Sequence, residues 1–433
     1  MTQADISLIN IAVMAFVAWN IPLQLIPVMI WFERKGSAII QDRWGPIRAN
    51  IGGVRIFGML HNIADVVKLL MKEDVTPYHV QKFYYTLAPF WAMTVALLPL
   101  MLIPIAAPIN VAGYDLRFQV ADYESGLLMV FAITGLGVYA VILAGWASNN
   151  KYSMLGGLRS SAQMISYELA MGLSIVAILM VYQDLRIENI VAKQGELLTA
   201  FGHTLPIPNW GVVAQPIAFI VFLTAVFAET NRTPFDLAEG ESELVAGYHT
   251  EYSSMKFALF FMAEYANMIV GAVVVATLFF GGYQVPYVTT EMLRANPQYT
   301  LAAILGMTAL TGIVGGYIVY KRAPIMKAVI KKGLGAIEYY AIAFGLFGLA
   351  VAALVGIPLA LSLEIDADIA QIIVAAFQVT MLLAKALFFC WFYIHVRWTL
   401  PRFRYDQLMN LGWKLMIPIS LLNILVTGTL KIL

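Results

Sequence analysis

Residues 338–363 read EYYAIAFGLFGLAVAALVGIPLALSL and contain no charged side chain after Glu338. A helix rises about 1.5 Å per residue, so a stretch of this length can cross a bilayer core that is about 30 Å thick. The stretch therefore predicts a membrane-spanning helix. Comparable apolar runs recur along the chain. We therefore expect the bilayer, and not one central core, to determine the architecture.

The composition of the 433 residues supports this interpretation. Apolar residues make up 61% of the chain and charged residues 12%, with a mean hydropathy of +0.77. Soluble domains are about half apolar and about a quarter charged. The net charge of +1 provides no basic surface for nucleic acid. The single cysteine, Cys390, excludes a disulfide framework, an iron–sulfur cluster and a thiolate metal site within this chain alone. The five scattered histidines lack the spacing of metal ligands, which argues against haem or metal binding by this chain alone.

We predict an all-α fold, a polytopic transmembrane helix bundle that forms one integral membrane domain over residues 1–433. Its ten apolar segments occupy residues 6–31, 83–108, 124–147, 162–183, 212–229, 255–282, 299–320, 338–363, 370–396 and 411–431. The first segment lacks a basic start and a small-residue cleavage site, so we interpret it as a retained span.

The distribution of lysine and arginine predicts the orientation of the bundle. The loops 32–82, 148–161, 230–256, 321–337 and 397–414 contain 21 of these residues, whereas the opposite side contains five. Cytoplasmic loops carry the excess of positive charge. Both termini are therefore expected on the non-cytoplasmic side.

Two segments outside the spans stand out. Residues 50–75 place apolar side chains on one face of a helix, with charged residues between them, which predicts a helix lying in the membrane interface. Residues 229–254 form an acidic loop on the cytoplasmic side, with six acids and one arginine between Glu229 and Glu251. If this loop is helical, Pro234 suits its first turn and Thr233 its cap. The simpler interpretation is a solvated acidic loop.

Four ionisable residues lie within or at the end of predicted spans, namely Glu168, Glu229, Glu264 and Lys385. A charge near the bilayer centre is costly, so such residues usually mark an ion route or a contact between helices. Several carboxyl groups beside an acidic loop favour a proton relay. The alternative is a static bridge that holds helices together.

Five motifs, taken together, are similar to one known family. They are ERK at 33–35, IADVVKLLMKED at 63–74, GGLRSSAQMISYE at 156–168, EYSSMKFALFFMAEYANM at 251–268 and PRFRYDQLM at 401–409. The chain resembles the H/ND1 subunit of respiratory complex I, the proton-pumping NADH:quinone oxidoreductase. The resemblance covers most of the chain.

The resemblance implies a membrane subunit that forms the quinone access channel and couples quinone reduction to proton movement. It implies quinone-channel positions at Glu33, Arg34, Asp65, Arg232, Asp236, Phe257 and Phe261. It implies proton-relay positions at Glu168, Glu229, Asp236, Glu239, Glu241, Glu243 and Glu264. No catalytic and no metal-ligating residue is expected in this chain.

The same resemblance implies the surroundings of the chain. Quinone would bind transiently, while FMN and iron–sulfur clusters would lie on partner subunits. The partners would be the peripheral-arm iron–sulfur subunits and other membrane-arm subunits. The location implied is the bacterial inner membrane, with the acidic loop facing the cytoplasm.

Two departures from the family pattern affect these expectations. Ile47, His61 and Asn62 stand where the family pattern has Asn, Gln and Pro, so the details of the channel are open. Residues 284–365 look like an insertion that carries extra spans and has no assigned role.

Two other functions remain as alternatives. One is the equivalent subunit of a membrane-bound hydrogenase or of a ferredoxin- or F420-linked complex. The full acidic loop and the motif PRFRYDQLM argue against this alternative. The other is a stand-alone proton-coupled transporter, against which the absence of sequence repeats counts.

Overall fold

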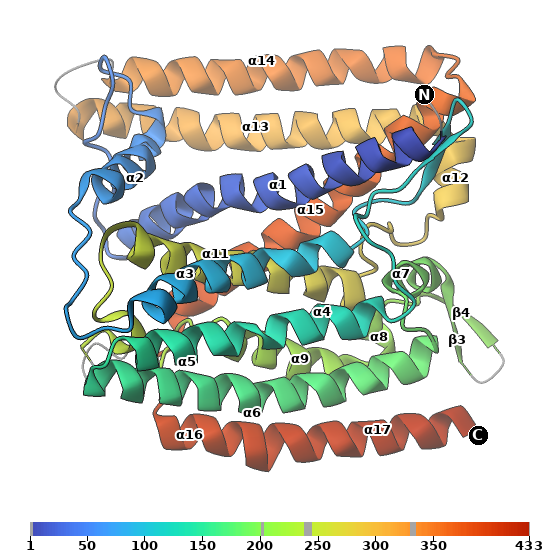
Figure 1. The fold of residues 1–433 in the computed structure, drawn as a ribbon. Helices are drawn as coiled ribbons and strands as arrows, with labels where there is room; N and C mark the ends of the chain where they lie inside the picture. Colours follow the sequence, from blue (N-terminus) through green and yellow to red (C-terminus); the bar gives the residue numbers. More distant parts are fainter. Residues whose placement is uncertain (1–2, 201–202, 238–244, 330–334, 433) are drawn as a thin grey trace.

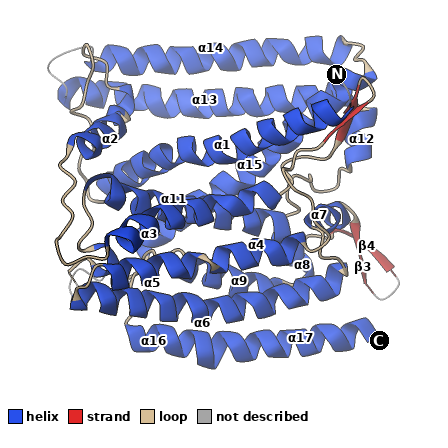
Figure 2. Ribbon diagram, viewed as in Figure 1, coloured by secondary structure: helices blue, strands red, loops and turns tan. Residues whose placement is uncertain are grey.

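The structure is a computed structural model that describes residues 3–200, 203–237, 245–329 and 335–432. Helices make up most of it, as Figure 2 shows. The helices that lie in the long apolar segments are α1 (Gln3–Ile40), α3 (Lys82–Leu97), α4 (Gly126–Gly135), α5 (Gly137–Ala147), α6 (Lys151–Tyr182), α11 (Ser254–Phe279), α13 (Pro297–Val329), α14 (Gly335–Ser362), α15 (Ala367–Thr399) and α17 (Ile417–Ile432). The other helices are α2 (Leu60–Met71), α7 (Ile187–Gln194), α8 (Gly211–Ala214), α9 (Pro216–Glu229), α12 (Thr290–Ala295) and α16 (Tyr405–Asn410).

The remaining regular structure is short. Turns of 3-10 helix occupy Ile56–Gly58, Leu98–Leu102 and Gly247–His249, and a π-helical segment, Leu411–Met416, joins α16 to α17. Strands β1 (Ile109–Val111) and β2 (Tyr114–Leu116) form one antiparallel hairpin, with Ile109 opposite Leu116. Strands β3 (Leu197–Ala200) and β4 (His203–Pro208) form a second, with Leu197 opposite Pro208.

Nine helical segments within the described residues are long and apolar enough to cross a bilayer. They confirm the predicted all-α, polytopic bundle. The fifth predicted span, 212–229, differs in form, because it contains the four residues of α8 and the 14 residues of α9. At about 1.5 Å per residue α9 is about 21 Å long, so it is shorter than the bilayer core is thick.

The apolar segments lie side by side in alternating directions, with α4 and α5 forming one of them, and both termini lie at the same end of the bundle (Figure 1). The hairpin of α13 and α14 forms one edge, α16 and α17 form the opposite edge, and α11 runs between them. Most of α11 is buried. Small residues allow this packing: a Cβ on Gly271 would come within 2.5 Å of the Val226 side chain on α9, so glycine permits the close approach.

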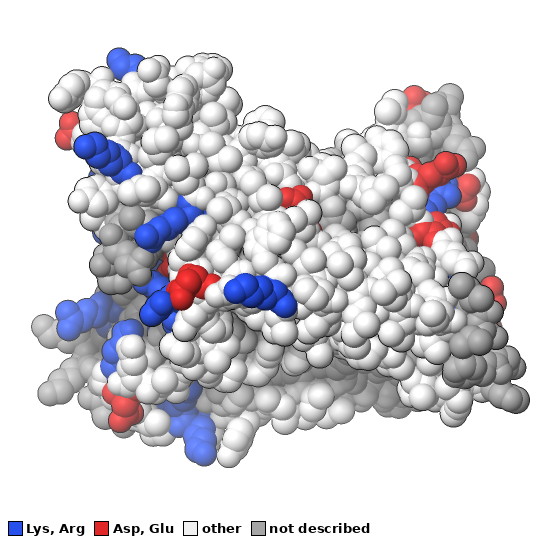
Figure 3. Space-filling view, turned by 90° about the horizontal axis from the view of Figure 1, so that it is seen from below, with Lys and Arg blue, Asp and Glu red and all other residues white. Residues whose placement is uncertain are grey.

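Lysine and arginine side chains gather toward one end of the bundle in the face that Figure 3 shows. This is the end at which α1, α5 and α13 finish and α2 lies (Figure 1). We refer to it as the basic end. The described spans, with their apolar outer faces, make the chain an integral membrane protein.

The predicted interfacial helix over 50–75 is shorter in the structure. The helix α2 covers only Leu60–Met71, and its exposed face carries Ile63, Val67 and Leu70. The chain before it is irregular because Gly58 has a φ of +88° and a Cβ there would collide with the Pro46 carbonyl oxygen. A helix cannot continue through that position.

The expectation for Thr233 and Pro234 is wrong within the described part of the acidic loop. Residues 231–237 form turns and irregular structure, so Pro234 does not begin a helix there. A hydrogen bond from the Phe403 backbone N–H to the Pro234 carbonyl (3.0 Å) ties this turn to the segment before α16. Residues 238–244 lie outside the described residues.

Candidate functional site

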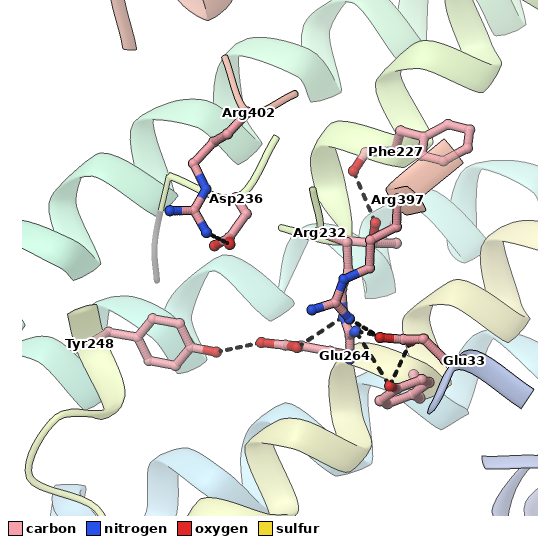
Figure 4. A network of polar contacts seen from close by, with 10 residues as sticks. Glu33, Phe227, Arg232, Asp236, Tyr248, Glu264, Arg397 and Arg402 are labelled. Atoms are coloured by element: carbon pink, nitrogen blue, oxygen red, sulfur yellow. Dashed lines mark hydrogen bonds and ion pairs between the residues drawn. The ribbon is translucent and has the colours of Figure 1, made fainter. Parts of the chain in front are cut away.

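A network of buried charges lies near the basic end of the bundle (Figure 4). Arg232, in the turn after α9, lies between Glu33 of α1 and Glu264 of α11. Its Nη1 is 3.4 Å from Glu33 Oε2, and its Nε is 3.3 Å from Glu264 Oε2. Each of these side chains is no more than 12% exposed. Buried charges of this kind require partners, and here one cation joins two carboxylates from different helices.

Three further side chains complete the network, and none of them was predicted from the sequence. Arg397, in the last turn of α15, forms an ion pair with Glu33. Tyr265 donates a hydrogen bond to Glu33 Oε2 (2.8 Å), and Tyr248 lies 3.3 Å from Glu264 Oε1. The Tyr265 ring also lies under the Arg232 guanidinium, 4.1 Å from its carbon, which adds a cation–π contact.

A signal for these missed residues was present in the sequence. Tyr265 is adjacent to Glu264 in the motif at 251–268, and Arg397 directly follows the predicted span 370–396. Glu33 and Arg232 stand at equivalent places, shortly after spans that end on the same side. Because buried acids require cations, charges that follow spans at one end of a bundle are natural partners.

Asp236 forms a second pair, separate from the first. Its Oδ2 lies 2.6 Å from Nη2 of Arg402, and the carboxylate is 8% exposed. Arg402 belongs to the motif PRFRYDQLM, and the rings of Phe235 and Phe403 lie 5.5 Å apart beside the pair. The motif at 401–409 therefore holds the first part of the acidic loop against the bundle.

The proposed channel positions near α2 form a third group. Arg34 forms an ion pair with Asp65, which ties the end of α1 to α2, and both side chains are more than 40% exposed. Phe257 and Phe261 stack along α11 with ring centroids 6.3 Å apart. The Arg232 guanidinium lies 5.3 Å from the Phe261 ring, so the aromatic pair leads toward the charge network.

The departures from the family pattern have local structural roles. Asn62 donates a hydrogen bond to the Pro27 carbonyl of α1 (2.6 Å), and the Ala49 backbone N–H lies 3.4 Å from His61 Nε2. These contacts attach α2 to α1 and to the preceding loop. The substitutions at 61 and 62 therefore contribute to the placement of α2.

Glu168 on α6 and Glu229 on α9 form a further group. A Cβ on Gly135 would come within 2.5 Å of Glu168 Oε1, so α6 presents this carboxyl group to the break between α4 and α5. Glu229 lines the same cavities as Thr134, the residue before Gly135, and it is close enough to Glu168 for the two carboxyl groups to interact. These two acids from α6 and α9 are therefore neighbours.

A cavity of about 40 Å³ connects Glu229 with the charge network. Both Glu229 and Glu264 line it, together with the polar side chains of Asn231, Tyr248 and Asn267. A space of roughly 10–15 Å³ on this measure can hold one water molecule when polar partners are present. The cavity therefore has room and polar groups for water between the two carboxyl groups.

Lys385 has a structural role. Its ammonium group donates hydrogen bonds to the carbonyl oxygens of Phe280, Gly282 and Gln284 at 2.6–2.8 Å, and it lies 5.0 Å from the Trp210 ring. These carbonyls follow the end of α11, where helical carbonyl groups lack partners. Lys385 therefore makes a static contact that holds the end of α11 against α15.

The predicted site residues thus fall into separate groups. The structure brings together Glu33, Arg232 and Glu264, and it brings Glu229 beside Glu168. Asp236 lies in its own pair with Arg402. Glu239, Glu241 and Glu243 lie outside the described residues. Over the described ranges, no cluster of three or more His, Cys, Asp and Glu side chains is arranged to hold a metal ion.

The fold and the site define a class: a polytopic membrane protein with a buried acid–base network at its basic end. Comparison with known proteins identifies the family. The family model described as NADH dehydrogenase matches residues 11–428. The chain therefore belongs to this family, and its resemblance to the H/ND1 subunit of complex I is confirmed.

Curated relatives match over nearly their whole length. The chain is 42% identical to the H 1 subunit of NADH-quinone oxidoreductase from Solibacter usitatus over 424 residues, which is 96% of each chain. It is 38% identical to the H subunit from Flavobacterium psychrophilum over 92% of this chain and 90% of that protein. It is also 38% identical to subunit 8 of the enzyme from Rhodothermus marinus over 97% of both.

Proposed function

We propose that this chain is a membrane subunit of a proton-translocating NADH:quinone oxidoreductase. In this role it forms the quinone access channel and couples quinone reduction to proton movement. One observation carries the coupling: Glu264 lies both on the cavity it shares with Glu229 and in the ion network that links Arg232 to Glu33. A change of charge at the network can therefore alter the protonation of carboxyl groups within the bundle.

The surface around α2 suits the access of a quinone. Its exposed Ile63, Val67 and Leu70 suit contact with lipid. A long isoprenoid tail could therefore pass from the bilayer to the protein at α2 without crossing water. Phe257 and Phe261 supply an aromatic surface between this helix and Arg232. Ligand sites are mostly apolar with a few convergent polar groups, and Arg34, Asp65 and Asp236 are proposed to supply these groups.

The charge network can respond to the reaction. Reduction of a quinone takes up protons and alters the charge near its headgroup. Arg232 touches two carboxylates, so a shift of its position changes how strongly it stabilises each negative charge. A displacement of about two pKa units corresponds to about 2.7 kcal/mol. Moving one charge across 100 mV requires about 2.3 kcal/mol, so the two energies are comparable.

The relay proceeds from this network into the bundle. Water in the cavity between Glu264 and Glu229 provides hydrogen-bonded steps from one carboxyl group to the other. Glu168 continues the path beyond Glu229. Asp236, Glu239, Glu241 and Glu243 are proposed to connect this path with the quinone chamber at the basic end.

The setting of the chain completes the proposal. The relatives bear the name NADH-quinone oxidoreductase, which favours this enzyme over a hydrogenase or a stand-alone transporter. The partners proposed are peripheral iron–sulfur subunits and other membrane-arm subunits. FMN and iron–sulfur clusters on those partners supply the electron transfer. The basic end is proposed to face the cytoplasm of a bacterium, across its inner membrane.

The test uses Glu264→Gln and Glu229→Gln in the assembled complex in inverted membrane vesicles. Glutamine keeps the shape of the side chain and removes its proton exchange. We expect quinone-linked NADH oxidation and proton uptake to fall by about tenfold, which corresponds to about 1.4 kcal/mol on the barrier. NADH oxidation by an artificial acceptor that takes electrons from the partner subunits should not change.

Glu196→Gln is the matched control, because Glu196 is an exposed carboxylate at the other end of the bundle. This variant should keep full activity. If fully assembled complexes with Glu264→Gln or Glu229→Gln took up protons at the wild-type rate, the proposed relay would be ruled out.

A further inference from the structure

A pocket of about 230 Å³ lies at the basic end, between α1 and α13. It is lined by Lys35, Ile39, Asp42, Arg43, Trp44, Arg322 and Ile325. We call it the Arg322 pocket. It lies outside the charge network, because none of its lining residues belongs to that network. We propose that the Arg322 pocket binds the phosphate headgroup of an anionic phospholipid.

The charges of the pocket favour an anion. Three cations, Lys35, Arg43 and Arg322, converge on it, and Asp42 is the one carboxylate among the lining residues. Lys35 and Arg322 are close enough for their like charges to interact. An anion between them would replace repulsion with attraction at both groups.

The cations also keep hydrogen-bond donors for a ligand. Lys35 donates to the Trp44 carbonyl (3.2 Å), and Arg43 Nε donates to Gln41 Oε1 (2.7 Å). Both of these acceptors are neutral, so neither cation loses its charge to a carboxylate through these bonds. An ammonium group has three donors and a guanidinium five, so most of them remain for phosphate oxygens.

The apolar part of the lining identifies the source of the phosphate as a lipid. Ile39, Trp44 and Ile325 are each about half exposed beside the cations. Tryptophan is typical of the level of lipid headgroups, and the two isoleucines offer a surface for the start of an acyl chain. A free phosphate ion would make no use of these three side chains. Basic pockets between membrane helices commonly hold anionic lipid headgroups.

The position of the pocket gives such a lipid a structural consequence. One wall comes from the end of α1 and the loop after it, and the other from α13. A bound headgroup would therefore join α13 to the segment that carries the Arg34–Asp65 pair. This inference does not depend on the proposed proton relay.

The test measures phospholipid binding to the purified, delipidated complex. Wild-type complex and variants are titrated with detergent micelles that contain phosphatidylglycerol or phosphatidylcholine with the same acyl chains. Bound lipid is then quantified by mass spectrometry. We expect saturable binding of phosphatidylglycerol and weaker binding of phosphatidylcholine. Arg322→Gln should weaken the phosphatidylglycerol affinity about fivefold, equivalent to about 1 kcal/mol.

Lys321→Gln is the matched control, because Lys321 is the adjacent, exposed cation and does not line the pocket. It should leave the affinity unchanged. Arg43→Gln provides a second pocket variant in case Arg322→Gln does not assemble. A photoreactive phosphatidylglycerol should also label peptides 35–44 and 321–325 of the wild-type complex.

Three results would overturn the proposal. One is equal phosphatidylglycerol affinity in the wild type and in a pocket variant. Another is labelling by the photoreactive lipid that omits both peptides. The third is displacement of the lipid by millimolar inorganic phosphate together with equal binding of the two phospholipids, which would assign the pocket to a free anion.

Discussion

The guanidinium of Arg232 lies within 3.4 Å of carboxylate oxygens from both Glu33 and Glu264. All three side chains are nearly buried and have lost most of their contact with water. The ion pairs between them replace the hydration that each charge has lost. Arg397 and Tyr265 add further contacts at Glu33. At the scale of single residues, the site is therefore a network in which one substitution alters several charges.

Arg232→Gln tests this dependence. Removing one partner of a buried ion pair typically costs about 3–5 kcal/mol, because a buried charge is left without compensation. We therefore expect a lower yield of assembled complex and a lower midpoint of thermal inactivation. Both are measured on membranes by native electrophoresis and by residual NADH:quinone activity after heating.

The double variant Arg232→Gln, Glu264→Gln separates charge from packing. It removes one uncompensated carboxylate, so we expect it to recover part of the thermal midpoint that the single variant loses. If the two residues act independently, the double variant will have a lower thermal midpoint than Arg232→Gln, by the same amount that Glu264→Gln alone lowers the midpoint of the wild type. That result would contradict the proposed coupling.

At the scale of elements, α14 supports the loop before α2. Glu338, in the first turn of α14, accepts hydrogen bonds from the backbone N–H groups of Arg55 (2.9 Å) and Ile56. Ile56 and Phe57 both have positive φ, which is unfavourable for such side chains. The Phe57 ring packs edge-on against Tyr339, 4.8 Å away. The pair of helices within 284–365, which had no assigned role, thus contacts the loop that leads to α2.

Glu338→Gln should loosen this loop. A hydrogen bond to a charged group contributes about 1.5–3 kcal/mol, so we expect amide exchange at residues 55 and 56 to accelerate by about 10- to 100-fold. Hydrogen–deuterium exchange with mass spectrometry of the complex measures the change. Glu364→Gln is the control, since Glu364 is exposed just beyond the other end of α14. Equal protection of residues 55 and 56 in Glu338→Gln and in the wild type would contradict this role.

At the scale of the whole molecule, the charge distribution supports the proposed orientation. The described lysines and arginines are concentrated at the end opposite to the two termini (Figures 1 and 3). The positive end of a membrane protein faces the cytoplasm. This end also carries the charge network and the Arg322 pocket, so both would meet cytoplasmic partners and the inner lipid leaflet.

Cysteine labelling checks the orientation. The only native cysteine, Cys390, is buried, so a new exposed cysteine can be detected against a low background. We expect Asp115→Cys, in β2, to react with a membrane-impermeant maleimide in intact cells, and Glu73→Cys to react only after the membrane is opened. The reverse pattern would overturn the orientation.

Much of the fold could be predicted from the order of apolar and charged residues. Ten apolar segments, the bias of lysine and arginine and the amphipathic pattern near α2 are local properties, because a bilayer imposes the same length and polarity on every span. The motifs also identified the family. The short form of α9 was not predicted, since its apolar run continues through residues 212–215.

The pairing of distant residues depended on tertiary structure. The sequence marks Glu264 as a costly charge, and the family resemblance adds Glu33 and Arg232. The contacts of Arg397 and Tyr265 with Glu33 depend on the packing of α15 and α11 beside α1. Lys385 is a charge within a predicted span, and the structure shows that it donates hydrogen bonds to carbonyl groups near the end of α11. The hydropathy of a segment predicts whether it lies in the membrane, because this depends only on its own residues. The partner of each buried charge depends on which helices pack beside one another, and only the tertiary structure determines that.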